Sequence, residues 1–131
     1  MTNTQPEVIL LVSGSRSIER HHWCYRCIDY ALSIKNIKTS DVKLLLNGGA
    51  DGVDQSAREW AMDKETIPVK LFKPNWEKEG KKAGFVRNEE MVKLATHVIA
   101  IWDGESTGTK HVIDVADAAN KLIGTFDSPF T

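Results

Sequence analysis

The 131-residue chain is long enough for one domain with a sizeable core and too short for two. A hydrophobic fraction of 41% and a charged fraction of 27% are typical of an ordinary globular protein. The formal net charge of -1 excludes a global basic field that would attract nucleic acid or a membrane. No apolar run approaches the ~20 residues of a membrane span, and the N-terminus has no secretory signal pattern. We therefore expect a single cytoplasmic domain over residues 1–131.

The first part of the chain alternates apolar runs with helical patterns. Residues 8–12 form a continuous apolar run, which predicts a strand buried on both faces, and a turn follows at residues 13–16. Apolar residues then recur at helical spacing over residues 23–34. Residues 42–46 predict a second buried strand, which ends at residues 47–49.

A second helix is expected after this loop, with Asp51 as its N-cap. The buried stripe predicted for it consists of Val53, Ala57, Trp60 and Ala61. Residues 68–72 predict a third strand, because Pro68 stands at the first position, where a missing N–H is tolerated. A long polar connection over residues 73–82 leads to a third helix over residues 83–95.

The last part of the chain repeats the pattern. Residues 97–102 predict a fourth strand, and a loop over residues 103–109 leads into a fourth helix. The residues expected on one face of that helix are Val112, Val115, Ala116 and Ala119. Residues 122–126 predict a short last strand. Such alternation makes βαβ units, so we predict a Rossmann-like α/β three-layer sandwich with a mainly parallel sheet of order 3-2-1-4-5.

Three loops of this fold are expected at the carboxyl edge of the sheet. The strand order reverses between the first and fourth strands, and ligands bind in the crevice at that point. The loops at residues 13–16 and 103–109 flank the crevice, and residues 47–54 lie one strand away. Each loop leads into a helix N-terminus, whose unpaired N–H groups and dipole favour an anion.

Two of these loops carry most of the candidate chemistry. Residues 104–109 have the composition of a phosphate cradle, because glycines let an anion approach the backbone, although the same composition is also good capping chemistry. Residues 48–54 combine glycines with Asp51 and Asp54. Two carboxylates repel phosphate, so this loop suits a ribose hydroxyl or a base amine, or its acids simply cap the helix.

Two arginines and an asparagine are further candidates for ligand binding. Arg16 lies at the tip of the first loop, and Arg87 and Asn88 lie in the first turns of the third helix. Arg87 shares an apolar stripe with Met91 and Leu94, at i, i+4 and i+7, and stands at its head, which directs it toward the carboxyl edge. It suits bidentate recognition of phosphate or carboxylate; the alternative is a salt bridge to a loop acid such as Asp51.

Other notable residues favour structural roles or leave two alternatives open. Trp76 is suited to stacking on a base or to a satellite core contact. Cys24 and Cys27 have C-x-x-C spacing but fall inside a predicted helix, so we expect structural thiols. The histidines show no metal-ligand spacing on one helical face, and we predict no metal and no cofactor. A local basic cluster, expected to be a solvated face, is formed by Lys78, Lys81 and Lys82.

The catalytic residues, if any, stay unknown at this stage, with Asp51, Asp54 and Arg87 as candidates. No nucleophilic triad is supported, and neither a P-loop motif nor G-x-G-x-x-G after the first strand is present. The predicted ligand-binding residues are Gly14, Ser15, Arg16, Gly48, Gly49, Ala50, Asp51, Asp54, Arg87, Asn88, Gly104, Ser106, Thr107, Gly108 and Thr109.

Taken together, these segments resemble the SLOG superfamily, named for its Smf/DprA and LOG members, and within it the small YspA-like branch. The resemblance implies a Rossmann-like fold, a pocket for nucleotides or nucleotide-derived ligands, and frequent homodimers. The matching pieces span roughly residues 8 to 120 in the expected order. They are Gly14-Ser15-Arg16, Gly48-Gly49-Ala50-Asp51-Gly52-Val53-Asp54, Trp76 with Gly80, Ala83-Gly84, Arg87-Asn88 with Met91, and Asp103-Gly104 with Ser106 and Gly108-Thr109.

One departure from the superfamily bears on activity. Its cytokinin-activating phosphoribohydrolases carry P-G-G-x-G-T-x-x-E at the fourth loop. This chain retains Gly108 and Thr109, but the position three beyond Thr109 is Val112. N-glycosidic cleavage would therefore need another acid, either Asp51 or Asp54, with a pKa raised by burial.

Three functions compete at this point. The leading hypothesis is a module that senses, carries or sequesters a phosphate-bearing nucleotide or a nucleotide derivative. The second is a hydrolase acting on the N-glycosidic or phosphate bond of such a ligand. The third, from DprA-type relatives, is binding of single-stranded DNA, which needs a basic groove with stacking aromatics; the net charge argues against it.

Overall fold

The computed structural model describes residues 7–64 and 67–127. The strands in those ranges pair in parallel throughout, in the order β3-β2-β1-β4-β5. They are β1 (Val8–Gly14), β2 (Val42–Asn47), β3 (Val69–Leu71), β4 (His97–Trp102) and β5 (Leu122–Asp127). This arrangement confirms the Rossmann-like α/β fold and the strand order 3-2-1-4-5.

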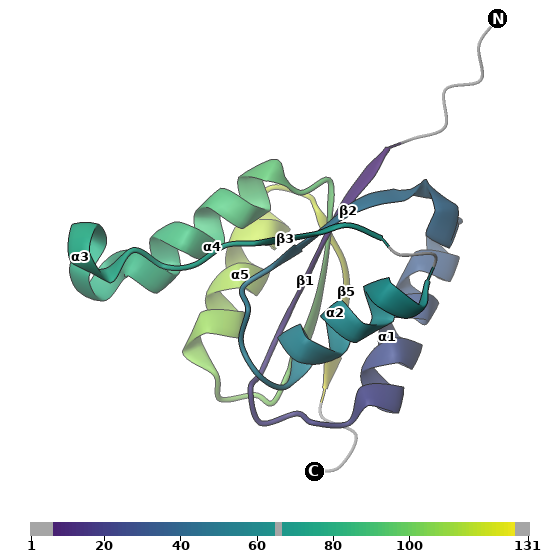
Figure 1. Ribbon diagram of the computed structural model, residues 1–131, viewed down its shortest axis with the longest axis horizontal. Helices are drawn as coiled ribbons and strands as arrows, with labels where there is room; N and C mark the ends of the chain where they lie inside the picture. The colour runs from purple at the N-terminus through teal and green to yellow at the C-terminus, as the bar shows by residue number, and fades with distance from the viewer. Residues whose placement is uncertain (1–6, 65–66, 128–131) are drawn as a thin grey trace, which may run out of the picture.

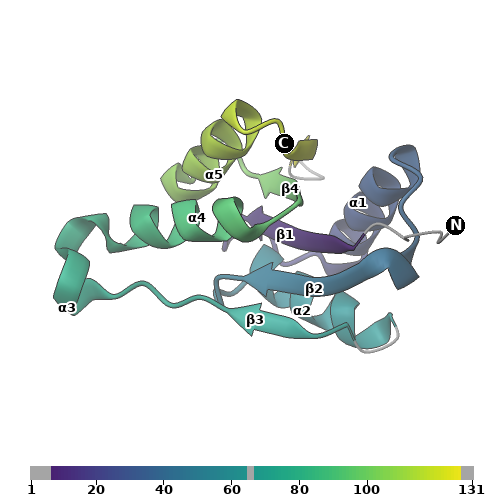
Figure 2. The same ribbon diagram turned by 90° about the horizontal axis from the view of Figure 1, so that it is seen from above.

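Helices cover both faces of the sheet. The α-helices are α1 (His21–Ile34), α2 (Val53–Asp63), α3 (Trp76–Glu79), α4 (Ala83–Leu94) and α5 (Thr107–Ala118), with single 3-10 turns at η1 (Thr39–Asp41) and η2 (Gly80–Lys82). α1 and α2 lie on one face, and α4 and α5 lie on the other (Figure 1). α3 lies beyond the carboxyl end of β3, away from the body of the sheet (Figure 2).

The apolar run of β1 is explained by burial on both faces. Leu10 and Val12 pack into the core beneath α1 and α2, whereas Leu11 packs beneath α4 and α5. Successive strand residues point to opposite faces. When helices cover both faces of a central strand, apolar residues are favoured at every position. The closely packed sheet is therefore a firm base for the loops at its carboxyl edge.

Several expected boundaries differ from those observed. β1 continues to Gly14, two residues past the apolar run. β3 is shorter than predicted, although Pro68 still accepts a hydrogen bond from Leu45 N at 2.8 Å. Ala119 was expected on the apolar face of α5 but is exposed, because it lies just past the helix end.

None of the helices in the described ranges combines the length and apolar character needed to cross a membrane.

Candidate functional site

A cleft of about 500 Å³ opens at the carboxyl edge of the sheet, where the loops after β1, β2 and β4 converge. This volume is within the range of about 300–1,000 Å³ found for small-molecule sites. Another hollow, of about 700 Å³, is lined by a single segment, residues 17–26. We take the first cleft as the candidate site because three separate loops and α4 build it.

Most of the predicted ligand-binding residues line this cleft. They are Gly14, Arg16, Gly48, Ala50, Asp54, Arg87, Asn88, Ser106, Thr107, Gly108 and Thr109. Four others do not line it, namely Ser15, Gly49, Asp51 and Gly104. The structure adds lining residues outside the predicted set: Leu11, Val12, Ser13, Ser17, Trp76, Met91 and Asp103.

Ser15 does not line the cleft, but its hydrogen bonds join the loop after β1 to the end of β4 and the loop that follows it. It is fully buried, its Oγ accepts a hydrogen bond from Asp103 N at 2.9 Å, and its own N donates to Ile101 O at 3.1 Å. Gly52 packs against the same loop and has a backbone φ of +70°. A Cβ on this residue would stand 2.5 Å from Arg16 O. Only glycine allows α2 to begin so close to the first loop.

The expected N-cap role of Asp51 is wrong. Gly52 is the N-cap of α2, and Asp51 is exposed and outside the cleft. Because Gly52 adopts a positive φ, the chain turns into the helix one residue later than the N-cap signal suggested. The alternative of a salt bridge between Arg87 and Asp51 is also absent from the ion pairs of the described residues.

The side chain of Asp103 holds the loop after β4. Asp103 Oδ1 accepts hydrogen bonds from Glu105 N and Ser106 N, both at 2.9 Å. These bonds, together with one from Ser17 Oγ, lower the pKa of Asp103 to about 2. Ser106 is the N-cap of α5, yet its Oγ faces Thr109 Oγ1 at 3.3 Å and caps no amide.

The first-turn amides of α5, residues 107–109, are thus free of a capping side chain. The N–H groups of a first helical turn have no partner within the helix, and they carry the positive end of its dipole. All three residues line the cleft. A Cβ on Gly108 would meet nothing within 4 Å, so the approach to this turn is open. The arrangement is suited to holding an anion.

Arg87 crosses from α4 toward the loop after β2. Its Nη1 donates to Gly48 O at 3.3 Å and Phe72 O at 3.2 Å, and its Nε donates to Asn88 Oδ1 at 3.0 Å. Burial lowers the pKa of Arg87, but an arginine stays charged in proteins. Of the apolar stripe expected below Arg87, Met91 is buried as predicted, whereas Leu94 is 48% exposed. The buried residues of α4 are Ala83, Asn88, Met91 and Val92.

Asp54 is a buried carboxyl in the wall of the cleft. Its Oδ2 accepts a hydrogen bond from Ala50 N at 3.1 Å. Burial raises its pKa, while the Ala50 amide and the charges of Arg87, Arg58 and Arg16 oppose that rise. A Cβ on Gly48 would lie 2.9 Å from Asp54 Oδ2 and 3.0 Å from Arg87 Nη1, so a larger residue there would push these two side chains aside.

Two residues that the sequence reasoning missed hold the loop after β2. Asn47 Oδ1 accepts from Gly49 N at 2.8 Å and from Arg58 Nη1 at 3.0 Å, while its Nδ2 donates to Asp54 O at 3.0 Å. Arg58 also reaches Ala50 O, at 3.2 Å. A polar Asn at the end of a buried apolar strand was the available signal, because a buried amide needs partners.

Trp76 lies in α3, with its side chain at the cleft and 60% exposed. Of its two predicted roles, the exposure disfavours a core contact. The nearby lysines at 78, 81 and 82 are exposed and do not line the cleft.

Cys24 and Cys27 are buried free thiols within α1, and burial raises the pKa of both. No group of three or more potential metal ligands gathers in the described ranges.

Comparison with known proteins places the chain in a family. A model of the YspA, cpYpsA-related SLOG family matches residues 8–78, which include the loops after β1 and β2 and also Trp76. The Gene 61 protein of Mycobacterium phage D29 is 41% identical over 92 residues, covering 66% of this chain and 74% of the phage protein. The resemblance drawn from the sequence is thus confirmed: the chain belongs to the YspA, cpYpsA-related SLOG family.

Proposed function

We propose that the chain binds a phosphate-bearing, nucleotide-like small molecule in this cleft and acts as a sensor, carrier or sequestering module for it. One observation carries the proposal: the uncapped first turn of α5 and the guanidinium of Arg87 converge on one cleft. Helix N-terminal amides and a planar guanidinium are complementary to phosphate oxygens. Family membership fits a nucleotide-related ligand.

The rest of the cleft suits the sugar and base of such a ligand. Trp76 offers an exposed aromatic face on which a base stacks. The carboxyl of Asp54 is an acceptor for a ribose hydroxyl or a base amine. Because burial raises its pKa, Asp54 opposes the phosphate charge less than an ordinary aspartate does.

An NMR titration of the backbone amides tests this assignment. The probes are AMP, ribose 5-phosphate and inorganic phosphate. We expect all three to shift the amides of residues 107–109 and the Arg87 Nε–H signal, and AMP alone to shift the Trp76 indole signal. Shifts confined to residues 17–26, the wall of the second hollow, would move the site and overturn the proposal. Mass spectrometry of small molecules released from gently purified protein would identify the natural ligand.

Hydrolysis of the ligand is the second candidate function, and it is favoured by one feature. Asp54 lines the cleft and has a raised pKa, which a general acid needs. Asp51 lies outside the cleft, so it is the weaker candidate of the two. Val112 lies on the buried face of α5 and supplies no acid at the position where the phosphoribohydrolase signature has glutamate. Binding without turnover remains our proposal.

We also propose that the chain forms a homodimer or a higher homo-oligomer, as the family resemblance implies. Large apolar side chains are exposed on β3, α3 and α4. These are Leu71, Trp76, Phe85 and Leu94. Light scattering during size-exclusion chromatography tests the prediction, and a monomeric mass at high protein concentration would contradict it.

A further inference from the structure

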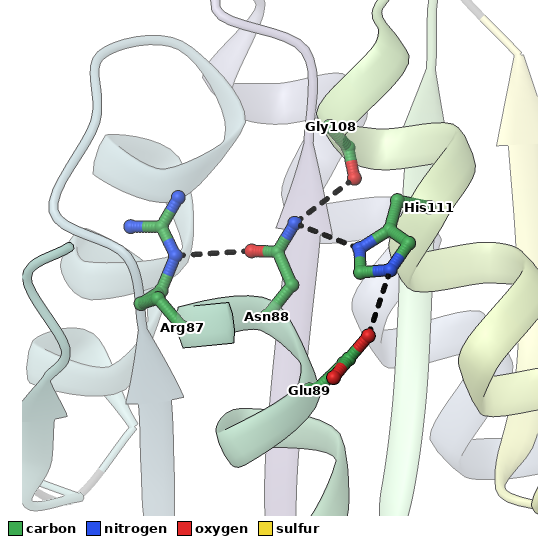
Figure 3. Close-up of polar contacts among 5 residues, drawn as sticks. All are labelled: Arg87, Asn88, Glu89, Gly108 and His111. Carbon is green, nitrogen blue, oxygen red and sulfur yellow. Dashed lines mark hydrogen bonds and ion pairs between the residues drawn. The ribbon is translucent and has the colours of Figure 1, made fainter. Parts of the chain in front are cut away.

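His111 lies on α5 outside the cleft, yet it contacts a residue inside it. The buried side chain of Asn88 stands between two helices (Figure 3). Its Nδ2 donates to Gly108 O at 3.3 Å and lies 3.4 Å from His111 Nδ1, while its Oδ1 accepts from Arg87 Nε at 3.0 Å. One amide thus joins His111 to both anion-binding elements of the cleft.

The contacts of Asn88 determine which ring nitrogen of His111 accepts a hydrogen bond in this arrangement. An amide nitrogen only donates, so Nδ1 of His111 is the acceptor and the ring proton lies on Nε2. Nε2 then donates toward Glu89 Oε2 at 3.4 Å. The ring also stacks on Phe85, with centroids 4.3 Å apart at an interplanar angle of 29°. The His111 side chain is 19% exposed, so protons from solvent reach it.

We propose that His111 is a positioning residue of the phosphate site, and that its protonation weakens anion binding. The inference rests on the proposed function. A proton on Nδ1 faces the NH₂ group of Asn88, and two donors repel. Rotation of the Asn88 amide relieves this clash but turns NH₂ toward Arg87 Nε–H and Oδ1 toward Gly108 O. Arg87 then loses its Nε partner, and the first turn of α5 loses its link to α4.

The sign of the effect distinguishes positioning from simple charge. Glu89 of α4 is the charged group that faces the ring, and Lys110 and Asp114 of α5 pair with each other at 2.9 Å on the exposed side. By Coulomb's law alone, a positive charge on His111 would strengthen the binding of a nearby anion as the pH falls. Loss of the Asn88 contacts would instead weaken anion binding as the pH falls.

Sulfate is the suitable probe, because it stays a dianion where phosphate esters take up a proton. We would titrate sulfate at about pH 8 and about pH 5.5, a range in which imidazoles gain a proton, and follow the amides of residues 107–109 by NMR. We expect the wild-type Kd to rise about fivefold at the lower pH, the effect of one ordinary hydrogen bond. In His111→Gln, whose side-chain oxygen accepts without titrating, this rise should disappear.

The matched control is His97→Gln, at the start of β4 and thus far from the loop that follows that strand. It should keep the wild-type rise. A change of sulfate affinity with pH that is the same in His111→Gln as in the wild type would overturn the role of His111 while leaving the anion site intact. No sulfate response of residues 107–109 at about pH 8 would overturn the anion site, and this inference with it.

A ligand-free measurement serves if the variant folds poorly. Nitrogen-15 shifts of His111 in the wild-type protein should show the Nε2–H tautomer at high pH, and the Asn88 side-chain NH₂ signals should move as His111 gains its proton. An Nδ1–H tautomer, or Asn88 signals that ignore the titration, would contradict the proposal.

Discussion

The hydroxyl of Ser15 accepts a hydrogen bond from the backbone N–H of Asp103 at 2.9 Å, across 88 residues of sequence. This contact joins the loop after β1 to the loop after β4, on the two strands that flank the reversal of strand order. Ser15 is fully buried, so no water replaces the bond if it is lost. The floor of the cleft therefore depends on a residue that does not line it.

Ser15→Ala should lower the free energy of unfolding by about 1–3 kcal/mol, because it leaves the Asp103 N–H without its partner. Urea denaturation monitored by circular dichroism measures the change. Ser17→Ala is the matched control, since Ser17 is exposed and bonds to the side chain of the same aspartate. Its cost should stay below about 1 kcal/mol. Equal costs for both variants would contradict the proposed role of the buried contact.

Asp103 predicts a dependence of stability on pH. Its pKa is lowered to about 2 by bonds from Glu105 N, Ser106 N and Ser17 Oγ. A depressed pKa in the folded state contributes stability above the unfolded value of about 3.9, and this contribution is lost as the pH falls toward 2. The unfolding free energy should thus fall more steeply between about pH 4 and about pH 2 for wild type than for Asp103→Asn. Parallel curves would show that Asp103 contributes nothing to the acid sensitivity.

Much of the fold was predictable because the apolar pattern follows directly from burial. The run at residues 8–12 is continuous because helices cover both faces of β1, and the alternation of elements then determines a parallel sheet. The arrival of the loops after β1 and β4 at one cleft follows from the strand order alone.

What the sequence could not show depends on single backbone angles and on tertiary hydrogen bonds. Asp51 reads as an N-cap, but the positive φ of Gly52 starts α2 one residue later and leaves Asp51 in solvent. Ser15 reads as a lining residue because it stands between Gly14 and Arg16, and only the path of the loop turns its hydroxyl toward Asp103. The link from His111 to Asn88 requires the packing of α4 against α5, which no local pattern encodes.

Gly108→Asp should weaken the binding of AMP at least about tenfold. It places a carboxylate at the open first turn of α5, where we expect the phosphate. A Cβ at this position meets no atom within 4 Å, so the fold should be unchanged. Calorimetry gives the affinity, and Gly108→Asn serves as the neutral control of equal size. Unchanged AMP affinity in the aspartate variant would place the phosphate elsewhere.

Trp76→Ala should weaken AMP about tenfold and leave the affinity for inorganic phosphate unchanged. Stacking of a base on an aromatic ring contributes about 1–3 kcal/mol, and phosphate has no base to stack. Quenching of tryptophan fluorescence by AMP, compared between the wild type and Trp76→Ala, reports whether Trp76 contacts the ligand. A parallel loss for both ligands would mean that Trp76 holds the shape of the cleft and does not contact a base.

Asp54→Asn separates a binder from a hydrolase. The wild-type protein incubated with AMP should return it chemically intact, as chromatography for free adenine and phosphorus NMR for inorganic phosphate would show. Asparagine keeps the shape and the acceptor that Ala50 N–H needs but removes the titrating group, so AMP affinity should be retained. Asp51→Asn is the control, because Asp51 is exposed and does not line the cleft. Release of adenine or phosphate by the wild type that persists in Asp51→Asn and vanishes in Asp54→Asn would overturn the binder in favour of an enzyme with Asp54 as its general acid.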